Sequence, residues 1–267
     1  MIDGVLDLLA CPRCGGGLAE RDGTLGCAAG HSYDLARQGY VNLLGGPEPA
    51  NADTPLMLQA RARVHAAGLF TPVAELVAAA ARGGSPVLDV GAGTAHYLVA
   101  ALGDDPDAVG LALDVSKAAA RVAARADPRV GAVVADVWRP LPVRSRCVGT
   151  VVCVFAPRNL GEFARVLRPD GRLVVATPGS AHLDGLRDRH GLLRVPEGKD
   201  ALVAAAAEEF FELVDTHVAR YRVAVEAALA RDLIAMGPNA FHRVPDDVGA
   251  AEVSIDVTVQ TYRPLDR

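Results

Sequence analysis

Four residues near the start of the chain have the types and spacing of zinc ligands. Cys11 and Cys14 are separated by two residues, and Cys27 and His31 form a second pair farther along. Thiolates at this spacing can both reach one metal ion from a tight turn. Three sulfurs and one imidazole then complete a tetrahedral shell that leaves no position for a substrate. We therefore predict a structural zinc ion at these four residues.

A second stretch that suggests chemistry is the turn Asp89-Val-Gly91-Ala92-Gly93-Thr94-Ala95-His96, which follows a short apolar strand and opens a helix. Two cofactors compete for such a turn. A dinucleotide-binding fold uses G-x-G-x-x-G/A, which would put the ring of His96 at the contact between helix and strand. A methyltransferase uses an acid two residues before G-x-G-x-G, and here Ala95 replaces the third glycine. The turn alone separates the two cofactors only weakly.

Acids that follow the next two apolar runs favour the methyltransferase. Asp114 ends a strand predicted over 108–113, and Asp136 ends one predicted over 130–135. Asp114 is placed to accept both ribose hydroxyls of S-adenosylmethionine, and Asp136 is placed near the adenine edge. Each acid could instead cap a helix, but Asp89, Asp114 and Asp136 together fit a cofactor site better. We predict that S-adenosylmethionine binds to residues 89–96, Asp114 and Asp136.

Alternating strands and helices must position these residues. Further apolar runs predict strands over 148–155 and 172–176, with helical stretches between the strands. This order implies an α/β fold with a doubly wound parallel sheet and ligands at the carboxyl ends of its strands. Residues 253–259 alternate between apolar and polar, which predicts a half-buried antiparallel strand paired with 213–225. Such a hairpin after a parallel sheet is typical of a class I methyltransferase.

The chain divides into three predicted parts. Residues 1–45 form a small zinc-binding module, 46–84 form a linker followed by helices, and 85–267 form the S-adenosylmethionine-dependent methyltransferase domain. The helices are expected over 56–67 and 72–81, with Asp53 or Thr54 as the cap of the first.

Bulk properties narrow the class of protein. Half of the 267 residues are apolar and the net charge is −5. No stretch approaches the ~20 apolar residues of a membrane helix, and the N-terminus does not resemble a secretory signal. We therefore expect a cytoplasmic protein with no membrane partner. Seven arginines against two acids between residues 139 and 172 could bind phosphates, although such a patch can also be a solvated face.

The chain resembles the bacterial 23S rRNA (guanine-N1)-methyltransferases of the RlmA type, which include macrolide-resistance proteins of actinomycetes. The zinc pattern followed by Gly39-Tyr-Val-Asn-Leu-Leu44 is specific to this family, whereas the glycine turn is not. Other matching stretches cover nearly the whole length: Asp34 to Arg37, Asp53 to Arg61, Ala67 to Pro72, Leu88 to Gly93, Leu113 to Lys117, Leu141-Pro142, Phe155 to Pro157, Glu162 to Leu167, Thr177 to Leu183, and Met236 to Pro238.

The resemblance implies a module that helps to recognise a hairpin of 23S rRNA, in isolated RNA or in the large ribosomal subunit. It also implies methyl transfer to guanine N1 and a homodimer. By the same analogy Phe70 and His182 border the cofactor beside the glycine turn. Phe70 replaces the more usual tyrosine, so ring stacking is kept and a hydroxyl contact is lost.

Guanine N1 is hidden in a base pair, so the target must be unpaired or flipped into a pocket. We predict this pocket just past the fourth strand. There Phe155 would stack on the base, Asn159 would bond its edge and Arg158 would balance charge that develops on O6. The same loop could instead be a proline-stiffened support for the cofactor. His182 and Asp136 are candidates for the general base, without further support.

Two rival functions stay open from the sequence. One is a small-molecule methyltransferase of an antibiotic pathway with a structural zinc module. RNA binding should weaken steeply with salt, whereas turnover of a small molecule should not. The other is a module that binds RNA or cofactor without catalysis, and the intact acids argue against it.

Overall fold

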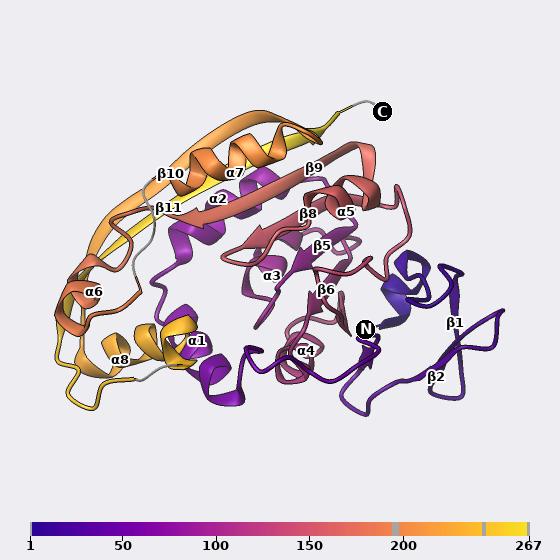
Figure 1. Cartoon of the computed structure of the whole chain (residues 1–267), viewed down its shortest axis with the longest axis horizontal. Coiled ribbons are helices and arrows are strands. Elements are labelled where there is room, and N and C mark those ends of the chain that lie inside the picture. Colours follow the sequence, from indigo (N-terminus) through magenta and orange to yellow (C-terminus); the bar gives the residue numbers. More distant parts are fainter. Residues whose placement is uncertain (1, 194–197, 242–243, 266–267) are drawn as a thin grey trace.

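Residues 2–193, 198–241 and 244–265 are described by a computed structural model of the chain. An eight-stranded sheet, in the spatial order β10-β11-β9-β8-β5-β6-β7-β4, forms its centre (Figure 1). In chain order the strands of this sheet are β4 (Tyr40–Asn42), β5 (Val87–Val90), β6 (Gly110–Asp114), β7 (Val130–Val134), β8 (Val148–Val154), β9 (Leu167–Pro178), β10 (Phe211–Val225) and β11 (Ala251–Pro264).

The middle of the sheet is parallel, which confirms the predicted doubly wound arrangement. β5 pairs in parallel with β6 on one side and with β8 on the other, and β7 and β9 extend the sheet outward. Every residue of β5, β6, β7 and β8 is buried. This is the pattern of strands covered on both faces. The carboxyl ends of these strands meet at one edge, which brings Asp89 and Asp114 close together.

The predicted C-terminal hairpin is also confirmed. β10 and β11 pair antiparallel, with Tyr221 opposite Ile255 and Val223 opposite Val253, and β11 pairs antiparallel with β9. β10 has no neighbour on its other side among the described residues, so it is an open edge of the sheet.

Helices cover both faces. The two helices expected after the linker are confirmed as α1 and α2, and Thr54 caps α1 by accepting the N–H of Met57 at 3.3 Å. The helices are η1 (Ile2–Leu8, a 3₁₀ helix), α1 (Pro55–Ala66), α2 (Thr71–Ala81), α3 (His96–Leu102), α4 (Lys117–Ala123), α5 (Leu160–Val166), α6 (Asp184–His190), α7 (Lys199–Ala207), α8 (Ala227–Ala235) and η2 (Pro238–Phe241).

Two hydrophobic cores lie on opposite faces of the sheet. One contains Val73 of α2 and Leu98 of α3, and the other contains Val5 of η1 and Phe163 of α5. Because η1 precedes the cysteines, the start of the chain is anchored in the core of the larger domain.

The cysteines lie in a small antiparallel sheet of its own, made of β1 (Leu18–Arg21), β2 (Thr24–Cys27) and β3 (Ser32–Asp34). We call residues 9–47 the zinc ribbon. Near the end of this ribbon, β4 belongs to the main sheet and pairs in parallel with β7. The predicted first part, 1–45, therefore includes one strand of the main sheet.

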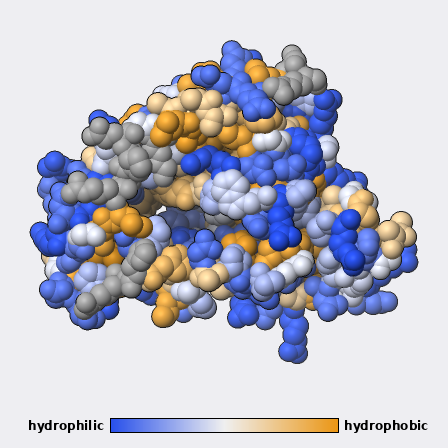
Figure 2. Space-filling model, in the orientation of Figure 1, coloured by the Kyte–Doolittle hydropathy of each residue, from blue (hydrophilic) through white to orange (hydrophobic). Residues whose placement is uncertain are grey.

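No single described helix is long and apolar enough to cross a membrane, and only the pair α1 and α2, bent by 88°, passes on combined length and composition. The face drawn in Figure 2 is hollowed beside the carboxyl end of β8, between the sheet and α1.

Candidate active site and zinc centre

The four predicted zinc ligands come together in the ribbon. Their ligand atoms all lie within 4.8 Å of one another. The Sγ atoms of Cys14 and Cys27 are 3.7 Å apart, and Nδ1 of His31 lies 3.4 Å from Sγ of both Cys11 and Cys27. Zn–S bonds of about 2.3 Å place two sulfurs of a tetrahedron about 3.8 Å apart. The cluster therefore fits a structural zinc ion, with no ligand position left for a substrate.

Local turns explain why these side chains converge. Gly15 has φ of +73° and donates its N–H to the carbonyl of Cys11 at 2.8 Å, which closes the first turn. Cys27 donates its N–H to the carbonyl of His31 at 3.0 Å, which closes the second. The Tyr33 hydroxyl lies 3.2 Å from Sγ of Cys11 and can donate to that thiolate. Such outer contacts orient and tune metal ligands.

The glycine turn is packed too tightly for larger residues. Gly91 has φ of +72°, and a Cβ there would lie 2.4 Å from Cβ of Ala156. Gly93 has φ of +53°, and a Cβ there would lie 2.5 Å from Nη1 of Arg61. Gly91 is therefore required by the close approach of Ala156 as well as by its backbone conformation, whereas at Gly93, where the close atom is the end of a long side chain, the positive φ is the stronger requirement.

Ala95, which replaces the third glycine of the methyltransferase pattern, also has a left-handed backbone with φ of +59°. It is fully buried and directly precedes α3. A left-handed conformation costs an alanine roughly 1–2 kcal/mol. The turn geometry is thus kept, at the expense of local strain.

Two buried acids, Asp89 and Asp114, lie at the turn, and Asp114 fixes it. Asp114 accepts the N–H of Gly93 and the N–H of Ser116, each at 2.8 Å. Burial raises the pKa of Asp114, and the two N–H donors oppose that rise. Burial, and then the neighbouring Asp114, raise the pKa of Asp89 to about 8. Contact of Asp114 with ribose stays a prediction, since both of its oxygens already accept backbone N–H groups.

Asp136 lies at the third strand end, as expected, but is only half buried. Its carboxylate accepts the N–H of Trp138 at 3.0 Å and lies 3.7 Å from Nε of Arg139. It therefore closes the turn after β7, and its place near the adenine edge stays a prediction.

The structure brings Phe70 and His182, which the resemblance places beside the cofactor, together with Phe155, which the sequence predicts to stack on the guanine. The ring centroids of Phe70 and His182 are 5.9 Å apart, those of Phe70 and Phe155 are 6.0 Å apart, and those of Phe155 and His182 are 5.7 Å apart. Nδ1 of His182 accepts the backbone N–H of Asp256 at 3.3 Å. Phe155 is 40% exposed and has φ of +54°, a strained conformation that often occurs at functional sites.

The other two predicted pocket residues have structural tasks. Nδ2 of Asn159 donates to the carbonyl of Val137 at 2.9 Å, and its Oδ1 accepts the N–H of Glu162 at 3.4 Å as the cap of α5. Nη1 of Arg158 donates to the carbonyl of Ala156 at 3.4 Å. Direct contact of Asn159 with a base stays a prediction, and the geometry favours its role as a support for the loop.

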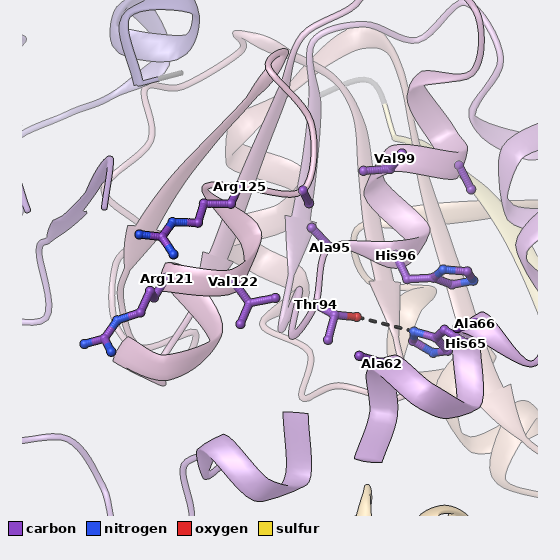
Figure 3. A pocket seen from close by; sticks show the side chains of 12 residues that line it. Ala62, His65, Ala66, Thr94, Ala95, His96, Val99, Arg121, Val122 and Arg125 are labelled. Carbon is purple, nitrogen blue, oxygen red and sulfur yellow. Dashed lines mark hydrogen bonds between the residues drawn. The ribbon is translucent and has the colours of Figure 1, made fainter. Parts of the chain in front are cut away.

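Thr94, Ala95 and His96 face a separate groove between α1, α3 and α4, with a volume of about 840 Å³ (Figure 3). His96 stacks on His65 with ring centroids 3.9 Å apart, and Nδ1 of His65 lies 3.3 Å from Oγ1 of Thr94. Burial, with His96 and Arg61 nearby, lowers the pKa of His65 to about 3, and burial also lowers that of His96. Both rings are therefore neutral at pH 7.

Arg61 and Tyr97 were missed by the sequence reasoning. The guanidinium of Arg61 lies against Gly93, donates to Asp53 at 2.5 Å and donates to the carbonyl of Met236 at 2.7 Å. The sequence could have identified Arg61, because it is the last residue of the stretch Asp53 to Arg61 that matches the family. Tyr97 has a buried hydroxyl with no hydrogen-bond partner among the described residues. A tyrosine on an apolar helix face gives no such signal, because it is indistinguishable from a core residue.

The buried acids, the two glycines and the unpartnered hydroxyl together fit S-adenosylmethionine at the carboxyl edge of β5 and β6. A polar atom inside such a site requires a partner, and a ligand can supply one.

The chain is similar to known methyltransferases over nearly its whole length. Residues 9–47 match the family model described as RlmA, N-terminal, and residues 88–175 match a methyltransferase domain. A Micromonospora griseorubida protein named as a 23S rRNA (guanine-N(1)-)-methyltransferase is 46% identical over 98% of this chain and 99% of its own length. The Streptomyces fradiae 23S rRNA (guanine(748)-N(1))-methyltransferase is 42% identical over 98% of both chains. A Bacillus subtilis protein named for the same guanine-N(1) activity is 30% identical over 94% of this chain and 95% of its own.

Proposed function

Because this chain belongs to the family of 23S rRNA (guanine-N1)-methyltransferases, we propose that it transfers a methyl group from S-adenosylmethionine to N1 of a guanine in a 23S rRNA hairpin. The observation that carries the proposal is one continuous similarity that includes both a Cys₃His zinc ribbon and a methyltransferase turn. The small-molecule alternative has no comparable observation in its favour.

S-Adenosylmethionine supplies a methyl group made electrophilic by a positively charged sulfur, so this chain mainly has to position the reactants. We assign the fixing of the glycine turn to Asp114, and the wall beside the reacting atoms to the rings of Phe70, Phe155 and His182. The exposed part of Phe155 supports its role as the residue that stacks on the guanine. Arg158 is assigned to the charge that develops on O6, and Asn159 to holding the loop as a positioning residue.

Arg61 extends this assignment to the amino-acid end of the cofactor. Its guanidinium touches the turn at Gly93, and two of its five N–H groups are accounted for by Asp53 and Met236. The remaining donors match a carboxylate, which arginine binds in a charge-assisted pair. We assign Arg61 to the carboxylate of S-adenosylmethionine.

The proposal is tested by incubating the protein with tritiated S-adenosylmethionine and 23S rRNA that lacks this methylation. We expect label in a guanine, and primer extension to stop at one position because N1-methylguanine blocks pairing. The Streptomyces fradiae relative is named for guanine 748, so that position is the first to compare. Label in small molecules but not in rRNA would replace the proposal with the small-molecule alternative.

We further propose that the chain forms a homodimer. A homodimer is supported by the open edge of β10, which is 15 residues long and carries an exposed Val218, because an unpaired strand can pair with a second copy. Light scattering of the purified protein tests this.

A role in macrolide resistance, exercised on ribosomes in the cytoplasm, predicts a higher inhibitory macrolide concentration in a sensitive host that expresses the chain.

A further inference from the structure

The chain has a single tryptophan, and it lies on the surface. Trp138 is 67% exposed, although a tryptophan usually buries most of its ring. Arg139 beside it has a side chain that is 71% exposed. The indole of Trp138 has no role in the sites described above, whereas Nε of Arg139 lies 3.7 Å from Oδ2 of Asp136. An exposed indole beside arginines is typical of surfaces that stack on unpaired nucleic-acid bases.

Trp138 lies on a segment that joins the two functional parts of the molecule. We call residues 137–145 the strap. At one end the carbonyl of Val137 accepts the side chain of Asn159, from the loop of Phe155, at 2.9 Å. At the other end Arg144 donates its N–H to the carbonyl of Leu8 at 2.8 Å, and Val143 forms a bridge with Leu9. The strap therefore runs from the proposed base pocket to the start of the zinc ribbon.

A crevice of about 340 Å³ opens between the strap and the ribbon. Three arginines and no acid belong to its lining: Arg13 of the ribbon, Arg144 of the strap and Arg165 of α5. Arg165 is neutralised by Glu162 at 2.7 Å. Arg13 and Arg144 are both exposed and form no ion pair among the described residues. A positive crevice of this kind suits a phosphate group.

Resting on the proposed function, we infer that the strap and the ribbon together form the surface that reads the RNA. Trp138 stacks on an unpaired base of the hairpin, and Arg13 and Arg144 hold phosphates of the strand that enters the crevice. RNA is favoured over a protein partner because the strap that carries the exposed Trp138 also lines a crevice with two exposed arginines, Arg13 and Arg144, that form no ion pair among the described residues. This combination matches stacking on a base of a single-stranded loop together with phosphate contacts. Stacking on the adenine of the cofactor is the alternative that the test must separate.

The single tryptophan makes the test specific, because all indole fluorescence comes from Trp138. The full-length protein is titrated with a hairpin fragment of 23S rRNA, with a fully paired duplex of the same length, and with S-adenosylhomocysteine. We expect quenching by the hairpin, less quenching by the duplex, and none by S-adenosylhomocysteine alone. Quenching by S-adenosylhomocysteine alone would assign Trp138 to the cofactor and overturn the inference.

Variants provide an independent measurement. Trp138→Ala should raise KM for the hairpin about ten- to a hundredfold and leave the Kd of S-adenosylmethionine unchanged, and Trp138→Phe should recover most of the loss. Arg13→Ala and Arg144→Ala should each reduce the slope of log K against log salt by about one. The matched controls are Leu202→Ala, at another exposed apolar residue, and Arg82→Ala, at another exposed arginine.

The outcomes separate this inference from the function on which it rests. If the wild-type protein methylates rRNA while Trp138→Ala keeps its KM and hairpin binding leaves the fluorescence unchanged, the inference fails and the function stands. If the wild-type protein methylates no rRNA, the proposed function itself fails.

Discussion

The zinc ribbon and the parallel sheet are held together by different physics. In β1, β2 and β3 only Leu18 and Leu25 are buried, whereas β5 to β8 are buried at every residue. A segment with so small a core depends on its metal for folding. The sheet instead depends on apolar burial and close packing. Loss of the metal should therefore impair RNA methylation without affecting cofactor binding, and steric changes at the glycine turn should impair cofactor binding without affecting zinc content.

Loss of a zinc ligand should have the largest effect. Zinc contributes about 10 kcal/mol or more to small zinc-dependent folds, so Cys14→Ser should lose the metal and its RNA methylation while still binding S-adenosylmethionine. Metal analysis, limited proteolysis and cofactor titration measure the three consequences. Cys147→Ser, at a half-buried cysteine outside the cluster, is the control. A Cys14→Ser protein that keeps its zinc and full activity would contradict the comparison.

Gly91→Ala should weaken binding of the cofactor and leave the zinc ribbon intact. The new Cβ would lie 2.4 Å from Cβ of Ala156. Overpacking of this kind costs about 1–3 kcal/mol, in addition to the backbone strain. We expect cofactor affinity to fall at least tenfold with zinc content unchanged. Gly103→Ala controls for the strain alone, because Gly103 has φ of +53° with nothing within 4 Å of its Cβ position. If both variants lose the same amount of cofactor affinity, packing against Ala156 is unimportant.

Arg61→Ala should weaken the cofactor selectively. Loss of a charge-assisted pair predicts about a ten- to hundredfold higher Kd for S-adenosylmethionine. 5′-Methylthioadenosine, which lacks the amino-acid part, should bind equally to the variant and the wild type. Isothermal titration measures both ligands, and Arg63→Ala on the same helix is the matched control. If both ligands weaken together, Arg61 supports the fold of the turn and does not contact the carboxylate.

Acid should destabilise the sheet through His65. Burial lowers its pKa to about 3 in the folded protein, compared with about 6.5 when unfolded. Between pH 7 and pH 5 the unfolded chain takes up a proton that the folded chain refuses, so the free energy of unfolding falls by about 1–2 kcal/mol. Urea unfolding at both pH values should show a smaller fall in His65→Gln than in the wild type. Zinc release at low pH acts on both proteins and cancels in the difference. His217→Gln, at an exposed histidine, should behave like the wild type.

Ala95→Gly should have the smallest effect and be stabilising. Glycine removes the strain of a left-handed alanine but adds freedom to the unfolded chain, which leaves a net gain of about 1 kcal/mol or less. Thermal unfolding measures it. Ala92→Gly in the same turn has no positive φ to relieve and should lower the melting temperature. A lower melting temperature for Ala95→Gly as well would mean that its methyl group is needed for packing.

The sequence predicted what depends on local patterns. Alternation over 253–259 identified β11, and ligand spacing identified the zinc cluster. β4 escaped prediction because three residues are too few to show a period, and its pairing with β7 joins distant parts of the chain. No role was predicted for Arg61 because its contact also joins distant parts of the chain, and only the packing of α1 brings it to Gly93. Asn159 is different, because Asn with Glu162 three residues later is a helix-start pattern that could have been read as a cap.

The pairing of β4 with β7 also bears on any attempt to separate the two parts. Removing residues 1–47 would delete a zinc site and, with it, the strand that covers β7. The exposed edge would present unpaired backbone groups of a fully buried, valine-rich strand, and such edges drive aggregation. An insoluble truncated protein would thus report a missing edge strand and say nothing about recognition of RNA.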